Sequence, residues 1–576
     1  MAALFAVTGC SLYPPPQGVV GAGRQGLDGI ARLYDVRPLD PASAVPLSKQ
    51  AVEELAKTDP LQQLRGVTYE LTEGNHLAAD WLIQTPNVWG RPAASVPVIP
   101  PDCPACKTDL RLPVCRKRPD CDNRPCVVLD ASVSRPGMRA LRFCTGHSDA
   151  VVDRFYRLII SARRAVDVTM LQPPADGRFL AALRNALTWL AYSGRPVTVR
   201  IMVGNYPLTG TDVPQFLRAL MRDAVAVRHS RLRLYVGKIR SCDGASPCNT
   251  LSWNHSKIVA VDARRAIVGG HNMWTADYLL AAPTHDLSME VEGGAAYVAH
   301  RFADALWRFV CSRPANDPLN LAYEASAGKP DYVRGCLSDI TLPRQAESTE
   351  GVPVLAVGRL AAGIRSGFDD QSLIARDLML GAARQSIRMA QQDVAFSEFG
   401  GSDKSWPDSA LERMADLMAQ RQGDVYLVLS NYGADGPVGS YSNRIPLEAV
   451  GEHVRSLVKA RTRLPEAEIS ALLCRHLHLA PLRFGPDATW PGSRPIGLHT
   501  KLWMADDHVF YVGSDNLYPV DLQEFGYIVD DRSASAQIRH DYWDPMWQWS
   551  RGAAISGDDA PRCMFAAPRT TNAQAG

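Results

Sequence analysis

Apolar residues recur along this chain with two periods, and stretches of the two kinds alternate. Helical spacing covers residues 148–165 and 179–192, and each stretch leads into a short apolar run, VDVTML or VTVRIMVG. The same order returns at 371–384 and 409–422, which precede SIRMAQQDV and VYLVLSNYG. A period near 3.6 residues predicts a helix, and a short apolar run between turn signals predicts a buried strand. Alternating helices and strands predict an α/β fold.

Each half of the chain then reaches two apolar runs that are separated by a polar turn. The first pair lies in WNHSKIVAVDARRAIVGGHNMW, residues 253–274, and the second in GLHTKLWMADDHVFYVGSDNLY, residues 497–518. Apolar runs joined in this way predict a β-hairpin. The chain therefore contains an internal repeat with one hairpin in each copy.

The two copies also share polar residues in the same order. These are His255, Lys257, Asp262, Gly270 and Asn272 in the first copy, and His499, Lys501, Asp506, Ser514 and Asn516 in the second. Residues two apart on a strand lie on the same face, so each His projects beside its Lys, and the Asn arrives on the returning strand. Imidazole, ammonium and carboxamide groups that converge twice are suited to a phosphate, because they supply a nucleophile, an acid and anion-binding groups.

These residues resemble the HxKxxxxD motif and the trailing G-G/S-x-N of the phospholipase D superfamily, and both copies match at every position. The resemblance covers roughly residues 140 to 550. It implies two α/β lobes, each a mixed sheet flanked by helices, related by pseudo-twofold symmetry in a monomer with a pseudo-dimeric site. It also implies phosphodiester hydrolysis through a phosphohistidine, with no metal or other cofactor.

The resemblance assigns roles to the repeated residues. His255 attacks the phosphorus, while His499 protonates the leaving oxygen and then activates water. Lys257, Lys501, Asn272 and Asn516 hold the phosphoryl oxygens. A pseudo-symmetric site supports either order of the two histidines, so that choice stays open.

An acidic residue follows each motif. These residues are Asp286 and Glu524, and the resemblance implies that such a residue bonds the far nitrogen of a catalytic His. Glu290 competes with Asp286 for this role. Asp262 and Asp506 are expected at the hairpin turns, where an Asp commonly accepts backbone hydrogen bonds, so we interpret them as structural, together with Gly270 and Ser514.

The length of 576 residues indicates more than one domain or lobe. The predicted segments are a lipoprotein-type signal and Pro-rich tether (1–19), a Cys-rich extension (20–140), the first lobe (141–312), an inter-lobe linker (313–351), the second lobe (352–552) and a C-terminal tail (553–576). A helix is expected near 49–57. Aromatic residues at helical spacing near 302–309 and 542–549 predict a closing helix for each lobe.

The start of the chain and its cysteines both suggest export. MAALFAVTGC resembles a lipobox in which Cys10 would be acylated, although no basic residues precede it. No other stretch approaches the ~18 apolar residues of a membrane span. Of the 13 cysteines, those other than Cys10 are even in number, as disulfides in an oxidising compartment require. We therefore expect a periplasmic protein, an outer-membrane lipoprotein or a secreted protein.

Five cysteines cluster between residues 103 and 126, and two more flank a turn before the first motif. The five are Cys103, Cys106, Cys115, Cys121 and Cys126. Four of them could bind zinc, but spacing at the edge of the zinc range, the absence of His and the expected export favour disulfides. A small disulfide loop between Cys242 and Cys248 is also expected.

Composition narrows the substrate only slightly. A net charge of +2 and a pI near 7.9 give no overall polyanion-binding signature. An exported protein meets membranes, so the first hypothesis is a phospholipase D that degrades lipid to phosphatidic acid and also transfers phosphatidyl groups to alcohols. The alternative is a secreted nuclease, which needs a basic channel. The candidate arginines for that channel are Arg163, Arg164, Arg200, Arg231 and Arg233.

Two other functions are weaker hypotheses. A phosphatidyltransferase similar to cardiolipin synthase is disfavoured because membrane spans are not evident near the start of this sequence. A non-catalytic lipid-binding protein is disfavoured because both motif copies are complete.

Overall fold

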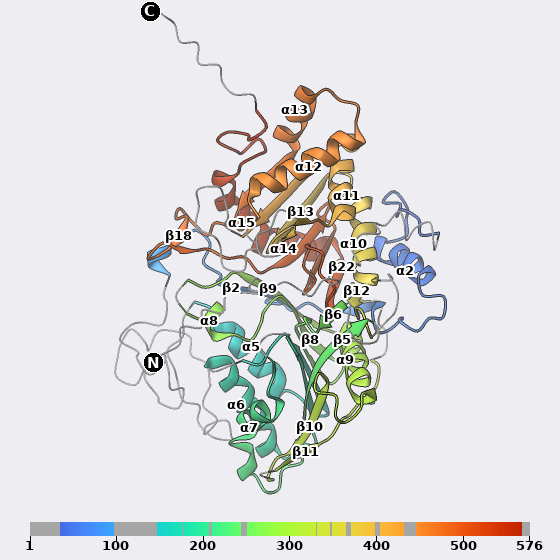
Figure 1. The fold of residues 1–576 in the computed structure, drawn as a ribbon, viewed down its shortest axis with the longest axis vertical. Coiled ribbons are helices and arrows are strands. Elements are labelled where there is room, and N and C mark those ends of the chain that lie inside the picture. The colour runs from blue at the N-terminus through green and yellow to red at the C-terminus, as the bar shows by residue number, and fades with distance from the viewer. Residues whose placement is uncertain are drawn as a thin grey trace, which may run out of the picture.

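The computed structural model describes residues 35–96, 147–174, 177–206, 210–243, 250–280, 282–329, 331–345, 348, 350–364, 370–397, 404–430 and 445–566. Within these residues the chain forms two mixed sheets, each flanked by helices, as the sequence predicts. Figure 1 shows the first sheet and its helices in the lower half of the molecule and the second in the upper half. No helix in the described ranges is long and apolar enough to cross a membrane.

The first lobe begins with alternating helices and strands. Its elements are α5 (Asp149–Ile160), β3 (Ala165–Met170), α6 (Arg178–Ser193), β4 (Thr198–Gly204), α7 (Val213–Met221), β5 (Arg233–Asp243), β6 (Thr250–Trp253), β7 (Ile258–Val261), β8 (Arg265–Gly269), α8 (Thr275–Tyr278), β9 (Asp286–Glu292), α9 (Gly294–Ser312), β10 (Leu321–Ser326) and β11 (Tyr332–Arg334). The strands β7 and β8 pair antiparallel and form the first predicted hairpin.

The second lobe repeats this order. Its elements are β12 (Val352–Arg359), α10 (Gln371–Ala382), β13 (Ser386–Gln391), α11 (Asp408–Arg421), β16 (Asp424–Leu429), α12 (Leu447–Arg461), α13 (Glu466–His476), β17 (Leu477–Pro481), β20 (Lys501–Ala505), β21 (Val509–Gly513), β22 (Glu524–Asp530), α14 (Arg532–Ile538) and α15 (Asp544–Ser550). Two short ribbons accompany them, β14 (Phe396–Ser397) with β15 (Lys404–Ser405) and β18 (Thr489–Trp490) with β19 (Arg494–Pro495). The strands β20 and β21 form the second predicted hairpin.

Strand order shows how closely the two sheets correspond. The first sheet contains the run β9-β8-β7-β3-β4-β5 and the second contains β22-β21-β20-β13-β16-β17. In the first run the hairpin pairs antiparallel with β3, and β3, β4 and β5 are parallel. In the second run the hairpin pairs antiparallel with β13, and β13, β16 and β17 are parallel. The repeat in the sequence therefore corresponds to a repeat in topology.

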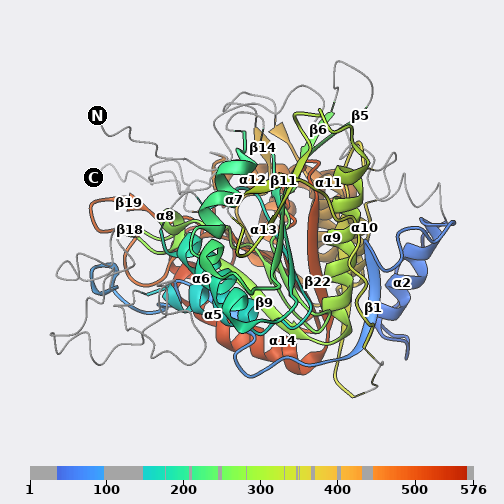
Figure 2. The same ribbon diagram turned by 90° about the horizontal axis from the view of Figure 1, so that it is seen from below.

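The helix α9 packs against both sheets. Its apolar residues belong to a core that also includes residues of β12 and β22, whereas α5, α6 and α7 pack on the other face of the first sheet in a separate core. Figure 2 shows α9 and the α5–α6 pair on opposite sides of the first sheet. The rings of Phe302 on α9 and Phe525 on β22 lie 5.0 Å apart. The Tyr527 hydroxyl donates to the Ala295 carbonyl at 2.9 Å. The lobes thus share a core.

The described part of residues 20–140 is built into both sheets. It contains α2 (Leu47–Lys57), where a helix is expected, as well as β1 (Tyr69–Asn75), β2 (Leu82–Thr85) and a 3-10 turn (Ala93–Ser95). The strand β1 pairs with β12 of the second lobe, and β2 pairs with β9 of the first. These two edge strands could not be predicted from the sequence, because their alternation of apolar and polar residues is short and interrupted.

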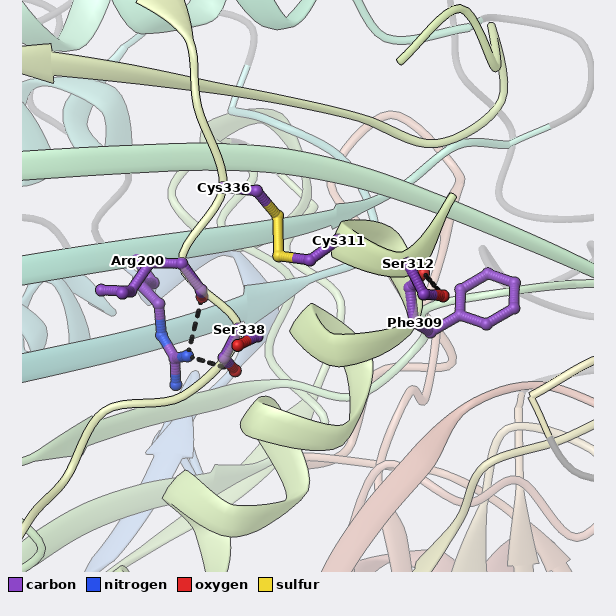
Figure 3. The surroundings of a disulfide bond; sticks show 7 residues. Arg200, Phe309, Cys311, Ser312, Cys336 and Ser338 are labelled. Carbon is purple, nitrogen blue, oxygen red and sulfur yellow. Dashed lines mark hydrogen bonds between the residues drawn. A yellow bond between two sulfur atoms is a disulfide. The ribbon is translucent and has the colours of Figure 1, made fainter. Parts of the chain in front are cut away.

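Two disulfides lie among the described residues. Cys311 bonds Cys336 and Cys474 bonds Cys563, with Cα–Cα distances of 5.6 Å in both. Figure 3 shows the first bond linking the end of α9 to the segment after β11. The carbonyls of Leu337 and Ser338 in that segment accept hydrogen bonds from Arg200 Nη1 at 3.1 and 3.0 Å. The bond therefore holds the inter-lobe segment over the first sheet. Cys10, Cys248 and the cysteines from Cys103 to Cys126 lie outside the described residues.

Candidate active site

Each hairpin is fixed at its turn by an aspartate. Asp262 has a positive φ of 55° and its carboxylate accepts backbone N–H groups of residues 163–165 at 2.7–2.8 Å. Asp506 has a φ of 51° and accepts those of residues 384–386 at 2.6–2.9 Å. Each aspartate thus anchors its hairpin to the start of the neighbouring strand, at the end of the hairpin away from the histidine. These contacts are the ones that a structural role requires.

The two motif histidines face each other between the lobes. The rings of His255 and His499 lie 6.4 Å apart between centroids, at an interplanar angle of 76°. Each residue is only 1% exposed. A phosphorus atom between the two rings could therefore be approached by an imidazole from either side.

Backbone hydrogen bonds cross from one lobe to the other at both histidines. The N–H of His255 donates to the Gln523 carbonyl at 2.9 Å, and the N–H of His499 donates to the His285 carbonyl at 2.7 Å. Each acceptor immediately precedes one of the predicted acids, Glu524 or Asp286. Because neighbouring residues on an extended chain lie about 3.3 Å apart, each acid is placed beside the histidine of the opposite lobe.

The acids accordingly pair with the histidines across the lobes. His255 Nδ1 lies 2.8 Å from Glu524 Oε1, and His499 Nδ1 lies 2.8 Å from Asp286 Oδ2. A carboxylate on Nδ1 leaves Nε2 for the reaction and stabilises an imidazolium. The sequence predicted both acids but not that they exchange lobes. Glu290, the competing candidate, is directed to Arg154 and Arg265 instead.

The two acids are held differently. The Asp286 carboxylate accepts from the Tyr278 hydroxyl and from its neighbouring Leu287 N–H, both at 2.8 Å. A Cβ on Gly270 would clash with the Asp286 carboxylate, so this position requires glycine. At the corresponding position of the second copy, Ser514 Oγ donates to Glu524 at 2.5 Å. Gly270 therefore leaves room for its acid, whereas Ser514 donates a hydrogen bond to its acid.

The lysines and asparagines of the motif lie in the same site. Lys257 Nζ donates to the carbonyl of His255 at 2.6 Å, and Lys501 Nζ donates to that of His499 at 2.5 Å. Within the described chain, the side-chain amides of Asn272 and Asn516 are buried without a hydrogen-bond partner. Unpaired buried amides are costly, which is the arrangement expected of groups that bind a ligand.

Burial and neighbouring cations change the proton affinities of the site. Burial lowers the pKa of His255 well below its ordinary value, and Lys257 and Lys501 lower it further. Burial, followed by the same two lysines, also lowers the pKa of His499. Burial raises the pKa of Glu524 to about 7. Both imidazoles of the free protein are therefore neutral at neutral pH, which is the form that can attack phosphorus.

Two residues of this site could not be predicted from the repeated motif. Tyr278 is part of the short helix α8, and its hydroxyl also accepts the Asn272 N–H at 3.2 Å. Arg359 ends β12, more than a hundred residues before the second motif, and its Nη2 lies 4.0 Å from Glu524. Only the register between β12 and β22 brings it there.

The arginines considered for a basic channel do not line this site. Arg163 and Arg164 lie beside the Asp262 turn, at the far end of the first hairpin. Arg231 and Arg233 lie at the same edge of the sheet, where β5 begins. Arg200 is buried between Asp167 and Asp304. The described residues contain no group of three or more His, Cys, Asp or Glu that could hold a metal ion.

Comparisons with known proteins agree with the motif. No family model matches the chain. Phospholipase D of Streptomyces antibioticus is 29% identical over 554 residues, which cover 88% of each chain. The predicted resemblance to the phospholipase D superfamily is confirmed. The prediction of a phospholipase D-like phosphodiesterase is confirmed by the same match.

Two solved structures are also similar to this phospholipase D-like chain. Phosphatidylserine synthase of Haemophilus influenzae Rd KW20 is 12% identical, with 75% of this chain and 89% of that chain covered and a TM-score of 0.44. Polyphosphate kinase of Porphyromonas gingivalis is 11% identical, with 68% and 44% covered and a TM-score of 0.35. These TM-scores are too low to support an argument about substrate.

Proposed function

We propose that this protein hydrolyses phospholipids to phosphatidic acid and the headgroup alcohol through a phosphohistidine. The observation that carries the proposal is the reciprocal arrangement of two buried histidines, each bonded at Nδ1 by a carboxylate from the other lobe. One acid–histidine pair suffices for general base catalysis. Two pairs that face each other can divide the roles of nucleophile and general acid.

The reaction follows in two displacements. Nε2 of His255 forms a bond to phosphorus while the bond from phosphorus to the headgroup oxygen breaks, and His499 gives that oxygen a proton. Glu524 stabilises the positive charge that develops on His255. His499, now neutral, removes a proton from water, whose oxygen bonds to phosphorus as the P–N bond breaks. The products are phosphatidic acid and the alcohol, and both histidines return to their starting state.

The oxyanion is stabilised by groups of the motif. The ammonium groups of both lysines lie close enough to act on both histidines, and the two motif amides are buried without a partner among the described residues. Hydrogen bonds from such fixed donors to the phosphoryl oxygens strengthen as charge develops. The two lysines supply the positive charge that metal ions supply in other phosphodiesterases. A bound phosphodiester anion also raises the pKa of His499, which burial and then the two lysines otherwise lower. Substrate binding thus helps to charge the general acid.

A lipid substrate is supported by apolar residues next to the motifs. Trp253 lies two residues before His255 and Tyr518 two residues after Asn516, and both belong to a small cluster formed by the two lobes. The other members are Leu171, Val520 and Leu522, with Tyr206, Trp274 and Phe396 packed against them. Apolar surroundings of the motifs are suited to the glycerol and acyl parts of a phospholipid, and the basic channel that a nuclease needs is not formed by the five candidate arginines.

The deciding experiment supplies phosphatidylcholine vesicles and plasmid DNA side by side. We expect choline release, no DNA cleavage, and activity that persists in excess EDTA. A His499→Ala variant serves as the control for contaminating activity. Loss of turnover on chelation, restored by a divalent ion, would contradict the mechanism. DNA cleavage without choline release would replace the lipid substrate by nucleic acid.

Added alcohol tests the covalent intermediate and also the phosphatidyltransferase alternative. A phosphatidyl group held on His255 after the headgroup leaves can react with any small alcohol that takes the place of water. With ethanol or glycerol present, we expect phosphatidylethanol or phosphatidylglycerol to form at the expense of phosphatidic acid, while choline release continues. Phosphatidylalcohol with no phosphatidic acid even without added alcohol would instead indicate a dedicated transferase.

We also propose that the protein is exported and acts as a monomer at a membrane surface. The two disulfides among the described residues support an oxidising compartment. Acylation of Cys10 is part of this proposal. Mass spectrometry of protein from the membrane fraction tests it, because the mass of the attached lipid should be lost in the Cys10→Ala variant.

A further inference from the structure

Among the described residues, a buried ion pair lies beside the His255–Glu524 pair, and none is found beside the His499–Asp286 pair. Arg359 is 4% exposed, and its Nη2 lies 2.8 Å from Asp515 Oδ1 and 4.0 Å from Glu524 Oε1. It is held in place by the direct pairing of Arg359 with Glu524 between β12 and β22. Asp515 lies between Ser514 and Asn516 in the second motif, so the ion pair joins the motif to the acid.

Asp515 is itself fixed on several sides. Its Oδ2 accepts from Ser372 Oγ at 2.5 Å, and its N–H donates to the Tyr511 hydroxyl at 3.1 Å. Among the described residues, Arg359 Nε is buried without a hydrogen-bond partner. The buried guanidinium therefore makes a short contact to Asp515 and a longer one to Glu524, and the charges of Asp370 and Asp521 also act on it. A charge at this distance in a buried site acts strongly on its neighbours.

The other acid–histidine pair has a different environment. Asp286 is held by the neutral Tyr278 hydroxyl and the Leu287 N–H. We propose that Arg359 and Asp515 form a charge-balancing pair that positions Glu524 and sets the protonation of the His255–Glu524 pair, and so distinguishes His255 from His499. The proposal rests on the proposed function for its kinetic consequence, but its electrostatic part concerns the free protein.

The charged groups that face His255 come from several elements. They are Glu524 on β22, Lys257 on its own hairpin, Lys501 and His499 on the second hairpin, Arg359 on β12 and Asp515 after β21. Arg359 lowers the pKa of His255 and of Glu524, whereas Asp515 raises the pKa of His255. Burial is the largest influence on both groups, raising the pKa of Glu524 and lowering that of His255. The members of the ion pair thus act on His255 in opposite directions.

Substitutions that remove one charge at a time test the pair. Arg359→Met removes the cation, so the His255–Glu524 pair should bind its proton up to higher pH, and the acidic limb of kcat/KM should move up by roughly 1 pH unit. Asp515→Asn should move the limb down. The double variant should return close to wild type, since the two changes are opposite in sign. Arg359→Lys, which keeps the charge, should leave the limb near its original position.

A measurement without substrate separates this proposal from the proposed function. Titration of the free protein labelled with ¹⁵N-histidine, with His255 assigned by comparison with His255→Ala, should show the same opposite shifts. Arg388→Met is the control, because this arginine pairs with Asp507 at the far end of the second hairpin and should leave His255 unchanged. Opposite shifts without any phosphodiesterase activity would overturn the proposed function alone.

Two results would overturn the inference. One is an active enzyme in which neither single variant moves the titration of His255. The other is a shift of the same sign in Arg359→Met and Asp515→Asn, as a merely structural disturbance would produce. If Arg359→Met does not fold, Arg359→Lys and Asp515→Asn still decide, because the first must leave the titration unchanged and the second must lower it.

Discussion

The two halves of the site share their backbone and differ in how each acid is held. Both hairpins are anchored by an aspartate at the turn, and both histidines donate a backbone hydrogen bond across the lobes. Glu524 is held by a serine and approached by an arginine, whereas Asp286 is held by a tyrosine. A repeated fold thus supplies two equivalent positions, and a few side chains make them chemically unequal.

This inequality bears on the order of the two histidines, which the motif alone leaves open. A nucleophile must be neutral before it attacks, and a nearby arginine favours the neutral imidazole. His255 has that arginine beside its acid. His499 has a neutral tyrosine there, so a bound phosphate anion can charge it more readily. The contrast supports His255 as nucleophile and His499 as general acid.

Loss of either histidine should have the largest effect. We expect His255→Ala and His499→Ala each to lower kcat by about 10⁴-fold or more, and the double variant to be only slightly worse, because residues that act as a unit are not additive. Choline release and circular dichroism check activity and fold. Losses that multiply in the double variant would mean that the two histidines act independently.

Neutralising the two acids should have the next largest effect on kcat, and the effect on the pH profile should differ between the two halves of the site. Glu524→Gln and Asp286→Asn should each lower kcat by about 10²- to 10³-fold, as loss of support for an acid–base group does. The pKa of Glu524 is raised to about 7, so its carboxylate forms, and activity rises, as the pH increases through that value.

The pH profile distinguishes the two acid variants. Glu524→Gln should remove the limb near pH 7, since a glutamine has no proton to lose. Asp286→Asn should keep this limb at lower overall activity. A limb that survives in Glu524→Gln and vanishes in Asp286→Asn would show that Asp286, and not Glu524, is the group that titrates near pH 7.

Smaller effects are expected from the groups that hold the acids. Tyr278→Phe and Ser514→Ala each remove one hydrogen bond to a carboxylate, worth about 1.5–3 kcal/mol in favourable cases. Only part of that is lost in the transition state, so we expect kcat to fall roughly tenfold, with KM for short-chain phosphatidylcholine little changed. A rise in KM without a fall in kcat would show that the residue binds substrate instead.

The sequence predicted those parts of the site that repeat. The two hairpins and the helix–strand alternation follow from the local pattern of apolar residues, and the acids Asp286 and Glu524 follow from their place behind each motif and the resemblance. Arg359 and the edge strands β1 and β2 could not be found in this way, because their positions depend on strand register between distant segments. The exchange of acids between lobes likewise depends on two backbone hydrogen bonds that no local pattern encodes.

At the hairpin turns the two halves of the site should respond alike to substitution, and activity should change least. Asp262 and Asp506 each accept three backbone hydrogen bonds at the same place in their hairpins. Replacing either by Asn weakens charge-assisted hydrogen bonds, so Asp262→Asn and Asp506→Asn should lower the free energy of unfolding by a similar amount, about 1–3 kcal/mol. Urea unfolding measures this, and kcat of the folded fraction should change by less than about threefold, because neither carboxylate faces the histidines. A folded Asp262→Asn variant as inactive as His255→Ala would show that the turn aspartate takes part in the reaction.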